Sequence, residues 1–430
     1  MNIILDKKNT LFYIVSVFIL TSPGISYSIF YPYHILIPFL LIFFLSYISR
    51  QSFFINKFNL YFIVFFIYII STGLLLDYYE LYFNYIFYSF ISITCLMFSF
   101  NFLLIKKDVD SVLKMVVLYV FVIIILAFLE SVNIVRLPFS PYSQYYSYFG
   151  KTIDMSEWTE EVFNYNTQKP TVFTGNPNTF GFLLMVYFPF IFLLKNKIIK
   201  SVLLAMVVFS IYKIDSKMIF MTFVFIVFLK FIILNERKLI SFLSILFLGF
   251  TLYPAFLYLQ TQGLLEGRMF NAINELLVGI EYISGNSNVS EMNSTGQRAL
   301  LYSIGIEKFT ENFFLGMGWS GIEGYLTHVM GEKVAFHNFF LMMLVDLGIL
   351  GFLVFSLFYF YVLKGLYKGM KEYRDTKLGK IYEAFFIGVI ASILCSIAPS
   401  GIVYLLPYWF FIGISLFMAY RYKEISAYYK

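Results

Sequence analysis

Long apolar segments constrain this chain more than any other feature of its sequence. A helix needs about 20 apolar residues to cross the hydrocarbon core of a bilayer, and such segments recur along most of the 430 residues. Only 13% of the residues are charged, too few to cover the surface of a soluble protein of this length. The sequence therefore predicts an all-α polytopic integral membrane protein with about twelve transmembrane helices. The expected spans lie near residues 10–28, 31–49, 58–76, 81–104, 112–130, 172–194, 198–214, 217–234, 239–260, 336–363, 381–398 and 402–420.

The basic residues test this count independently. With a cytoplasmic N-terminus, 22 of the 31 Lys and Arg residues fall in inside segments, and every even-numbered connection is basic. The positive-inside rule then places both termini in the cytoplasm. Two long connections, 130–170 and 261–335, are expected on the extracytoplasmic side of a single membrane domain over 1–430. The net charge of +6 thus follows topology, and we expect no nucleic-acid partner.

The second long connection predicts an amphipathic helix. Ser294 followed by Gln297 is typical of a capping box at a helix N-terminus. Arg298 then opens a segment that could lie on the outer membrane surface, where its guanidinium is suited to bind a phosphate. The expected apolar face repeats at helical spacing and consists of Ala299, Tyr302, Ile306, Phe309 and Phe313.

The stretch TGNPNTFG, residues 174–181, stands at the start of the sixth expected span. We expect Asn176 to cap this helix, with Pro177 in its first turn and Asn178 following. Free amide groups at a helix N-terminus also attract phosphate, but spacing alone favours the capping interpretation.

Other polar motifs are weaker. Asp108 and Asp110 resemble the metal-binding pair of nucleotide-sugar transferases, yet acids at the start of a helix are favoured by its dipole, and we prefer that structural interpretation. The sequence has no glycine-rich phosphate loop, paired metal-binding histidines or nucleophile elbow. We therefore predict no metal site, and ATP hydrolysis and metalloproteolysis are poorly supported.

Ionisable residues at the ends of expected spans are the remaining candidates. Lys213, Asp215 and Lys217 gather at an outer turn, where a functional and a structural role are equally favoured. His337 opens the tenth span, although a lone histidine at a helix start is more often structural. Asp346 lies roughly 14 Å deeper along the same helix, and needs a partner or a water-filled cavity there.

Taken in order, these motifs resemble the signature region of the O-antigen polymerase and O-antigen ligase superfamily. GQRALLYSIGIEKFTENFFLGMGWSGIEGYL precedes AFHNFFLMMLVDLGILGFLVF, and TGNPNTFG resembles an earlier family element. Arg298 matches the family's arginine, residues 312–318 its glycine turn, and His337-Asn338 its histidine motif. Asp346 stands where the family usually has an acid. Lys217 replaces a frequent arginine, which keeps the charge but loses the bidentate fork.

The resemblance implies a membrane-embedded, metal-independent, inverting glycosyltransferase without a cofactor. Such enzymes act on the outer face of the bacterial cytoplasmic membrane, with a glycan on undecaprenyl diphosphate as donor. It implies membrane lipid and a chain-length regulator as further partners. It also implies His337 and Arg298 as catalytic residues. The substrate-binding residues it implies are Lys217, Asn176, Asn178, Asn338 and Asp346.

Three functions remain open. In a polymerase the acceptor is another lipid-linked repeat unit, and in a ligase it is lipid A–core; the motifs of the two overlap. We favour the polymerase because the Phe-, Tyr-, Ile-, Asn- and Lys-rich composition resembles that of polymerases encoded in sugar-antigen clusters. A lipid-linked oligosaccharide flippase is the alternative from another class, but transporters typically place ionisable residues near the midplane, whereas most candidates here are at the outer surface.

The topology predicts which single cysteines an impermeant maleimide can label in intact cells. In a background without Cys95 and Cys395, a cysteine at Ser287 should be labelled and a cysteine at Lys371 should not. Labelling of Lys371→Cys in intact cells would overturn the topology.

Overall fold

The structure is a computed structural model that describes residues 10–22, 56–150, 159–233 and 294–425, and every regular element within these ranges is helical. The chain is a polytopic membrane protein, as predicted, and within the described ranges five helices are long and apolar enough to cross a bilayer. The expected spans near 31–49 and 239–260 lie outside the described residues. So do residues 261–293 of the second long connection, including Ser287. The five helical segments are Lys57–Leu75 (α4 and η2), Tyr82–Lys106 (α5), Val109–Ser131 (α6), Phe339–Glu372 (α15) and Lys377–Ile397 (α16 and η7).

Shorter helices complete the described fold. α13 begins at Ser294, where the capping box is expected, although the side chain of Ser294 is outside the described part. The sixth expected span, 172–194, divides into α8 and the 3₁₀ helix η4 at Phe188, next to Pro189. The shorter helices are α1 (Thr10–Thr21), η3 (Tyr146–Phe149), α7 (Glu160–Thr167), α8 (Pro177–Tyr187), η4 (Phe188–Leu193), α9 (Lys197–Ile214), α10 (Lys217–Phe228), the π-helix η5 (Leu229–Ile233), α13 (Ser294–Glu311), α14 (Gly321–Met330) and α17 (Leu406–Tyr420).

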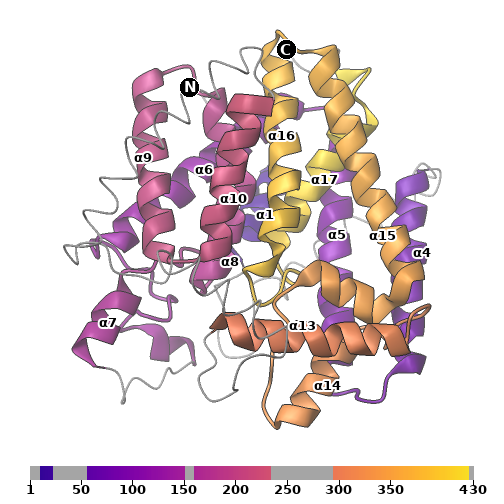
Figure 1. Cartoon of the computed structure of the whole chain (residues 1–430). Coiled ribbons are helices and arrows are strands. Elements are labelled where there is room, and N and C mark those ends of the chain that lie inside the picture. The colour runs from indigo at the N-terminus through magenta and orange to yellow at the C-terminus, as the bar shows by residue number, and fades with distance from the viewer. Residues whose placement is uncertain (1–9, 23–55, 151–158, 234–293, 426–430) are drawn as a thin grey trace.

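The long helices form a bundle with two different ends (Figure 1). The lysine-rich connections that follow α5, η4 and α15 lie at one end. α7, α13 and α14 lie at the other end, and α13 runs across the ends of the upright helices. This separation agrees with the even-numbered connections sharing one side of the membrane.

α17 forms the centre of the bundle, although it is short. It packs against α5 and α15, and its residues from Leu406 to Ala419 are all buried. Small residues permit this contact: a Cβ on Gly413 would meet the Ser99 hydroxyl, and a Cβ on Gly365 would meet Ala419. In a bilayer, where lipid is as apolar as the helix surface, such close approach is what holds helices together.

α15 differs from the single helix expected over 336–363. It runs from Phe339 to Glu372, and Gly348 interrupts it with a non-helical φ of 61° and ψ of −175°. The break divides α15 into a short first segment and a second segment that is long enough to cross the bilayer. Backbone groups freed by such a break must find other partners, because an unsatisfied group in the hydrocarbon costs several kcal/mol.

The connection between α13 and α14 supplies these partners. The carbonyl oxygens of Val345 and Asp346 accept hydrogen bonds from the amides of Met317 (3.1 Å) and Gly318 (2.9 Å). Beyond the break, the amide of Ile349 donates to the carbonyl of Phe313 at 2.9 Å. The loop therefore binds both sides of the interruption.

Two glycines allow this contact to be so close. Gly316 and Gly348 have φ values of 75° and 61°, a region that disfavours residues with a Cβ. A Cβ on Gly316 would lie 2.4 Å from the Asp346 carbonyl oxygen, and a Cβ on Gly348 would lie 2.4 Å from that of Phe314. Both positions thus need glycine for conformation and for space.

Replacing Gly316 should destabilise the protein more than replacing a glycine of the same conformation in open space. Gly331 is the matched control, because its φ is 72° and a Cβ there would meet nothing within 4 Å. Gly331→Ala should cost only the left-handed backbone penalty of about 1–2 kcal/mol. Gly316→Ala should cost clearly more, since backbone atoms must move. Thermal unfolding in detergent measures both, and equal shifts would contradict the close approach.

Candidate functional site

His337 lies in a constrained bend immediately before α15. Its φ of 56° is in the left-handed region, which is uncommon for a residue with a side chain. The Tyr302 hydroxyl on α13 donates to the His337 carbonyl oxygen at 2.9 Å. On the other side, Asn338 caps α15 by accepting from the Leu341 amide at 3.1 Å. The main chain of His337 is therefore held from both directions.

The imidazole of His337 is neutral at physiological pH. Burial lowers its pKa to about 4, helped by the nearby Arg298 charge and opposed by a hydrogen bond to the Pro399 backbone. Its Nδ1 is buried and has no hydrogen-bond partner among the described residues. A buried nitrogen without a partner, on a ring that carries no charge, is free to accept a proton from a bound molecule.

Arg298 supplies the positive charge beside this imidazole. Burial lowers the pKa of its guanidinium, and the Tyr302 phenol raises it slightly, but arginine remains protonated. Among the described residues, no carboxylate forms an ion pair with it. The structure thus brings Arg298 and His337 together, and we call Arg298, Tyr302 and His337 the His337 cluster.

The helix that carries Arg298 is confirmed, but its apolar face is narrower than expected. Ala299 is buried, and Tyr302 and Phe309 pack against the hydrophobic core. Ile306, at the same helical spacing, is 54% exposed and does not take part in this contact with the core. Phe313 follows the end of α13 and belongs to the loop that meets α15. The buried side of α13 rests mainly on α15.

Asp346 is fully buried and has its partners within the chain. Its carboxylate oxygens accept from the amides of Ser320 and Ile322, each at 2.9 Å. These amides stand at the start of α14, so Asp346 caps that helix. The sequence required a partner or a water-filled cavity for this buried acid, and backbone amides are that partner. Both carboxylate oxygens of Asp346 already accept hydrogen bonds from them.

Asn176, Asn178 and Lys217 form a second group, which we call the Lys217 cluster. Asn176 caps α8, as predicted: its Oδ1 accepts from the amides of Asn178 (2.9 Å) and Thr179 (3.2 Å). Gly181 has no Cβ to meet Ile219 of α10, so the first turns of α8 and α10 pack closely. Lys217, the first residue of α10, is thereby brought near the TGNPN turn.

The two clusters share one end of the bundle. α8 and α10 both pack against α16, and the chain that leaves α16 reaches Pro399 beside His337. α13 lies at the same end (Figure 1). The neighbouring charges have structural partners: Lys213 bonds Gln168, and Asp215 accepts from the Tyr165 hydroxyl.

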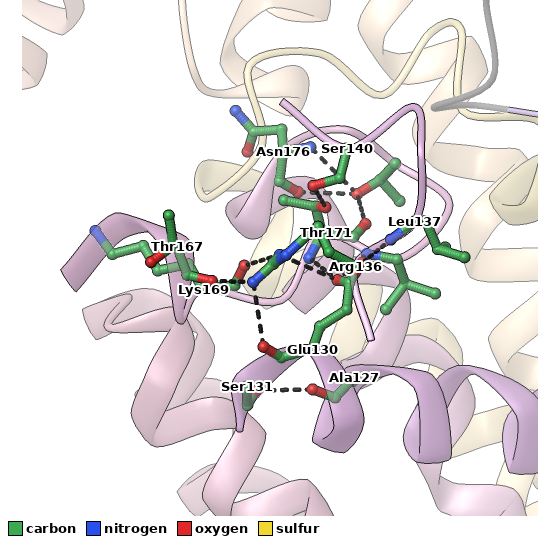
Figure 2. A network of polar contacts seen from close by, with 12 residues as sticks. Ala127, Glu130, Ser131, Arg136, Leu137, Ser140, Thr167, Lys169, Thr171 and Asn176 are labelled. Carbon is green, nitrogen blue, oxygen red and sulfur yellow. Dashed lines mark hydrogen bonds and ion pairs between the residues drawn. The ribbon is translucent and has the colours of Figure 1, made fainter. Parts of the chain in front are cut away.

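A buried acid at the end of α6 was not singled out by the sequence pattern. Glu130 is fully buried and accepts from the amides of Thr171 (2.7 Å) and Val172 (2.8 Å), while Arg136 lies 3.5 Å from its carboxylate (Figure 2). Arg136 also donates to the Lys169 carbonyl at 2.9 Å. This network fixes the chain that leads into the TGNPN turn. In the sequence, the only sign of this network is that Glu130 ends an apolar run.

The two aspartates near the start of α6 have the structural role we preferred. Asp108 caps α6 by accepting from the Ser111 amide at 3.3 Å. Asp110 pairs with Lys114 at 2.6 Å, one helical turn along.

One end of the bundle therefore combines a neutral imidazole, an arginine that has no carboxylate partner among the described residues, and a helix terminus beside a lysine. Such a set can bind an anion and accept a proton from a hydroxyl. A family model described as O-antigen ligase matches residues 201–356. The matched range includes Lys217, Arg298 and His337, and it ends within α15. No curated protein matches the chain in sequence.

Proposed function

We propose that this chain, which belongs to the O-antigen polymerase and ligase superfamily, polymerises lipid-linked oligosaccharide repeat units of an O-antigen or capsular polysaccharide. The donor is a glycan on undecaprenyl diphosphate, and the acceptor is another lipid-linked repeat unit. The reaction takes place on the extracytoplasmic face of the bacterial cytoplasmic membrane, with both termini on the cytoplasmic side. A chain-length regulator is a further proposed partner.

The observation that carries this proposal is the environment of Arg298. A partly buried guanidinium without a carboxylate partner is costly, unless a ligand provides the opposing charge. A diphosphate is such a ligand, and the planar guanidinium can bind two of its oxygens at once. The neutral imidazole of His337 beside it suits a reaction that must also remove a proton.

The proposed step forms one carbon–oxygen bond, breaks another and transfers one proton. A hydroxyl of the acceptor sugar gives its proton to the unpaired nitrogen of His337, and its oxygen attacks the anomeric carbon of the donor. The bond between that carbon and the diphosphate oxygen breaks, and undecaprenyl diphosphate leaves with the electron pair. Arg298 stabilises the charge that develops on the leaving group. Attack from the opposite side inverts the anomeric centre, and the activated donor makes a metal or cofactor unnecessary.

The other candidates receive different proposed roles. Lys217 and the side chain of Asn178 contact the diphosphate or the glycan, and Asn176 holds the turn that presents them. Asn338 and Asp346 are proposed to position the site, since their acceptor oxygens already bind helix N-termini. This replaces the direct substrate contact expected of both from the resemblance.

Deletion of the gene tests the function and separates it from its alternatives. A polymerase deletion should leave one repeat unit on the core and remove long chains from a gel of surface glycans. Bare core with polymer accumulating on the lipid carrier would indicate a ligase instead. Bare core with repeat units trapped on the inner leaflet would indicate a flippase.

Substitutions in the His337 cluster should abolish polymer without removing the protein from the membrane. His337→Ala removes the proton acceptor and should slow transfer by roughly 10²–10⁴-fold. Arg298→Lys should also be severely impaired, because lysine keeps the charge but loses the two-point contact. Glycan chain length, with a blot of the membrane fraction, measures both effects. Full-length polymer from a well-expressed His337→Ala protein would remove the histidine from the mechanism.

The pH dependence of kcat/KM should report the lowered pKa of His337. The base works only when unprotonated, so activity should persist below the ordinary histidine range and fall as the pH drops through about 4. Arg298 and the Tyr302 phenol, with a pKa raised to about 12, do not titrate in this window. A fall in kcat/KM centred near the ordinary histidine pKa would contradict the buried environment.

A further inference from the structure

One buried acid at this end of the bundle has no part in the proposed step. Glu323 stands in the first turn of α14 and is only 4% exposed. Burial raises the pKa of its carboxyl group. An acid is rarely kept in such a place unless its hydrogen bonds serve a purpose.

Both carboxylate oxygens of Glu323 bind groups far away in the sequence. Oε1 accepts from the amide of Phe336 at 2.8 Å, and Oε2 accepts from the Tyr85 hydroxyl on α5. Glu323 therefore ties the residue immediately before His337 to the body of the bundle. The loop that contains Phe336 has no helix or strand of its own to fix it.

The Phe336 ring fixes the same point from the other side. It is fully buried, lies 5.6 Å from the Tyr302 ring between centroids, and packs where a Cβ on Gly305 would collide with it. Glu323 thus holds the main chain of Phe336 while α13 holds its side chain. The left-handed bend at His337 begins from this fixed residue.

We propose that Glu323 is a positioning residue for His337: by holding the Phe336 amide, it sets the bend that aims the imidazole into the site. The proposal rests on the role of His337 in the proposed function. Glu323 does not contact the substrate; it acts through two backbone units. α14 is itself placed by Asp346, so the alignment of His337 depends on the loop that meets the break in α15.

A merely structural role would lower the amount of folded protein without changing how the remaining molecules work. A positioning role predicts a lower kcat, with little change in KM for the donor, and a changed environment of the imidazole. Burial is the main cause of the low pKa of His337, and a loosened loop admits water. The pH at which activity falls on the acidic side of the profile, which we call the acid limb, should then rise toward the ordinary histidine pKa. Removing the negative charge of Glu323 would by itself lower the pKa of His337, and so would lower this pH.

A shift of the acid limb can be assigned to His337 by considering the charged groups near its imidazole. Arg298 and Tyr302 face it from α13, and neither titrates near neutral pH. Glu323 approaches through Phe336, and Lys333 on the same loop acts on Glu323.

The test compares Glu323→Ala, Glu323→Gln and a control, Glu311→Ala, in membranes of the deletion strain. Glu311 is an exposed acid at the end of α13 that pairs with Lys308. Lipid-linked repeat units extracted from that deletion strain serve as substrate, and polymer formed is measured against pH. Glu323→Ala should lower kcat by roughly tenfold to a hundredfold, the scale of a small misplacement of a catalytic group, and shift the acid limb upward.

Glu323→Gln keeps an oxygen for the Phe336 amide, so it should retain most of kcat and the wild-type acid limb, as should Glu311→Ala. Should Glu323→Ala not accumulate, Glu323→Asp gives the same test, because it keeps the acid but withdraws it by one methylene. Wild-type kcat and pH profile in the Ala or Asp variant would overturn the proposal, as would an inactive but well-expressed Gln variant. His337→Ala, assayed alongside, separates this failure from that of the proposed function: if it is active, the role of the histidine itself is wrong.

Discussion

The exchange of backbone hydrogen bonds between the 312–318 loop and the break in α15 underlies the rest of the α13–α15 region. It satisfies carbonyl and amide groups that would otherwise be exposed where α15 is interrupted. It works only because Gly316 and Gly348 let the two backbones touch. Asp346 adds its side chain to the same contact by capping α14. One contact thus sets the direction of α15 and the position of α14.

The geometry of the candidate site depends on this contact between the 312–318 loop and α15. α14 carries Glu323 to the loop before His337, and α13 brings Arg298 and Tyr302 to the other side of that histidine. The chemistry needs a neutral imidazole and an arginine that no carboxylate neutralises. Partial burial supplies the first condition, since it disfavours the charged form of histidine. The lack of a carboxylate partner for Arg298 among the described residues supplies the second.

The helices could be predicted from the sequence, and the family resemblance pointed to Arg298 and His337. The place of Tyr302 beside them and the tertiary links could not be predicted. Apolar runs and basic turns identify spans locally, and the caps at Asn176 and Asp108 follow from residue type. Ile306 shows the limit of spacing, because a helical repeat does not say which apolar residue meets a neighbour. The break at Gly348 was not apparent, because the apolar residues continue on both sides of it. Glu130 was marked only by its place at the end of an apolar run, and Glu323 by no local pattern, because their partners lie outside their own helices.

The fully buried α17 has a consequence for how the protein tolerates change. Ser99 donates to the Phe410 carbonyl and Ser92 to that of Val403, so the hydrogen bonds from these serines of α5 reach α17 and the loop before it at main-chain oxygens. A carbonyl is present whatever residue occupies the position. The central helix can therefore vary its apolar residues over evolutionary time while its height and rotation stay anchored. Amino-acid substitution should be least tolerated at the serines of α5 and at Gly413.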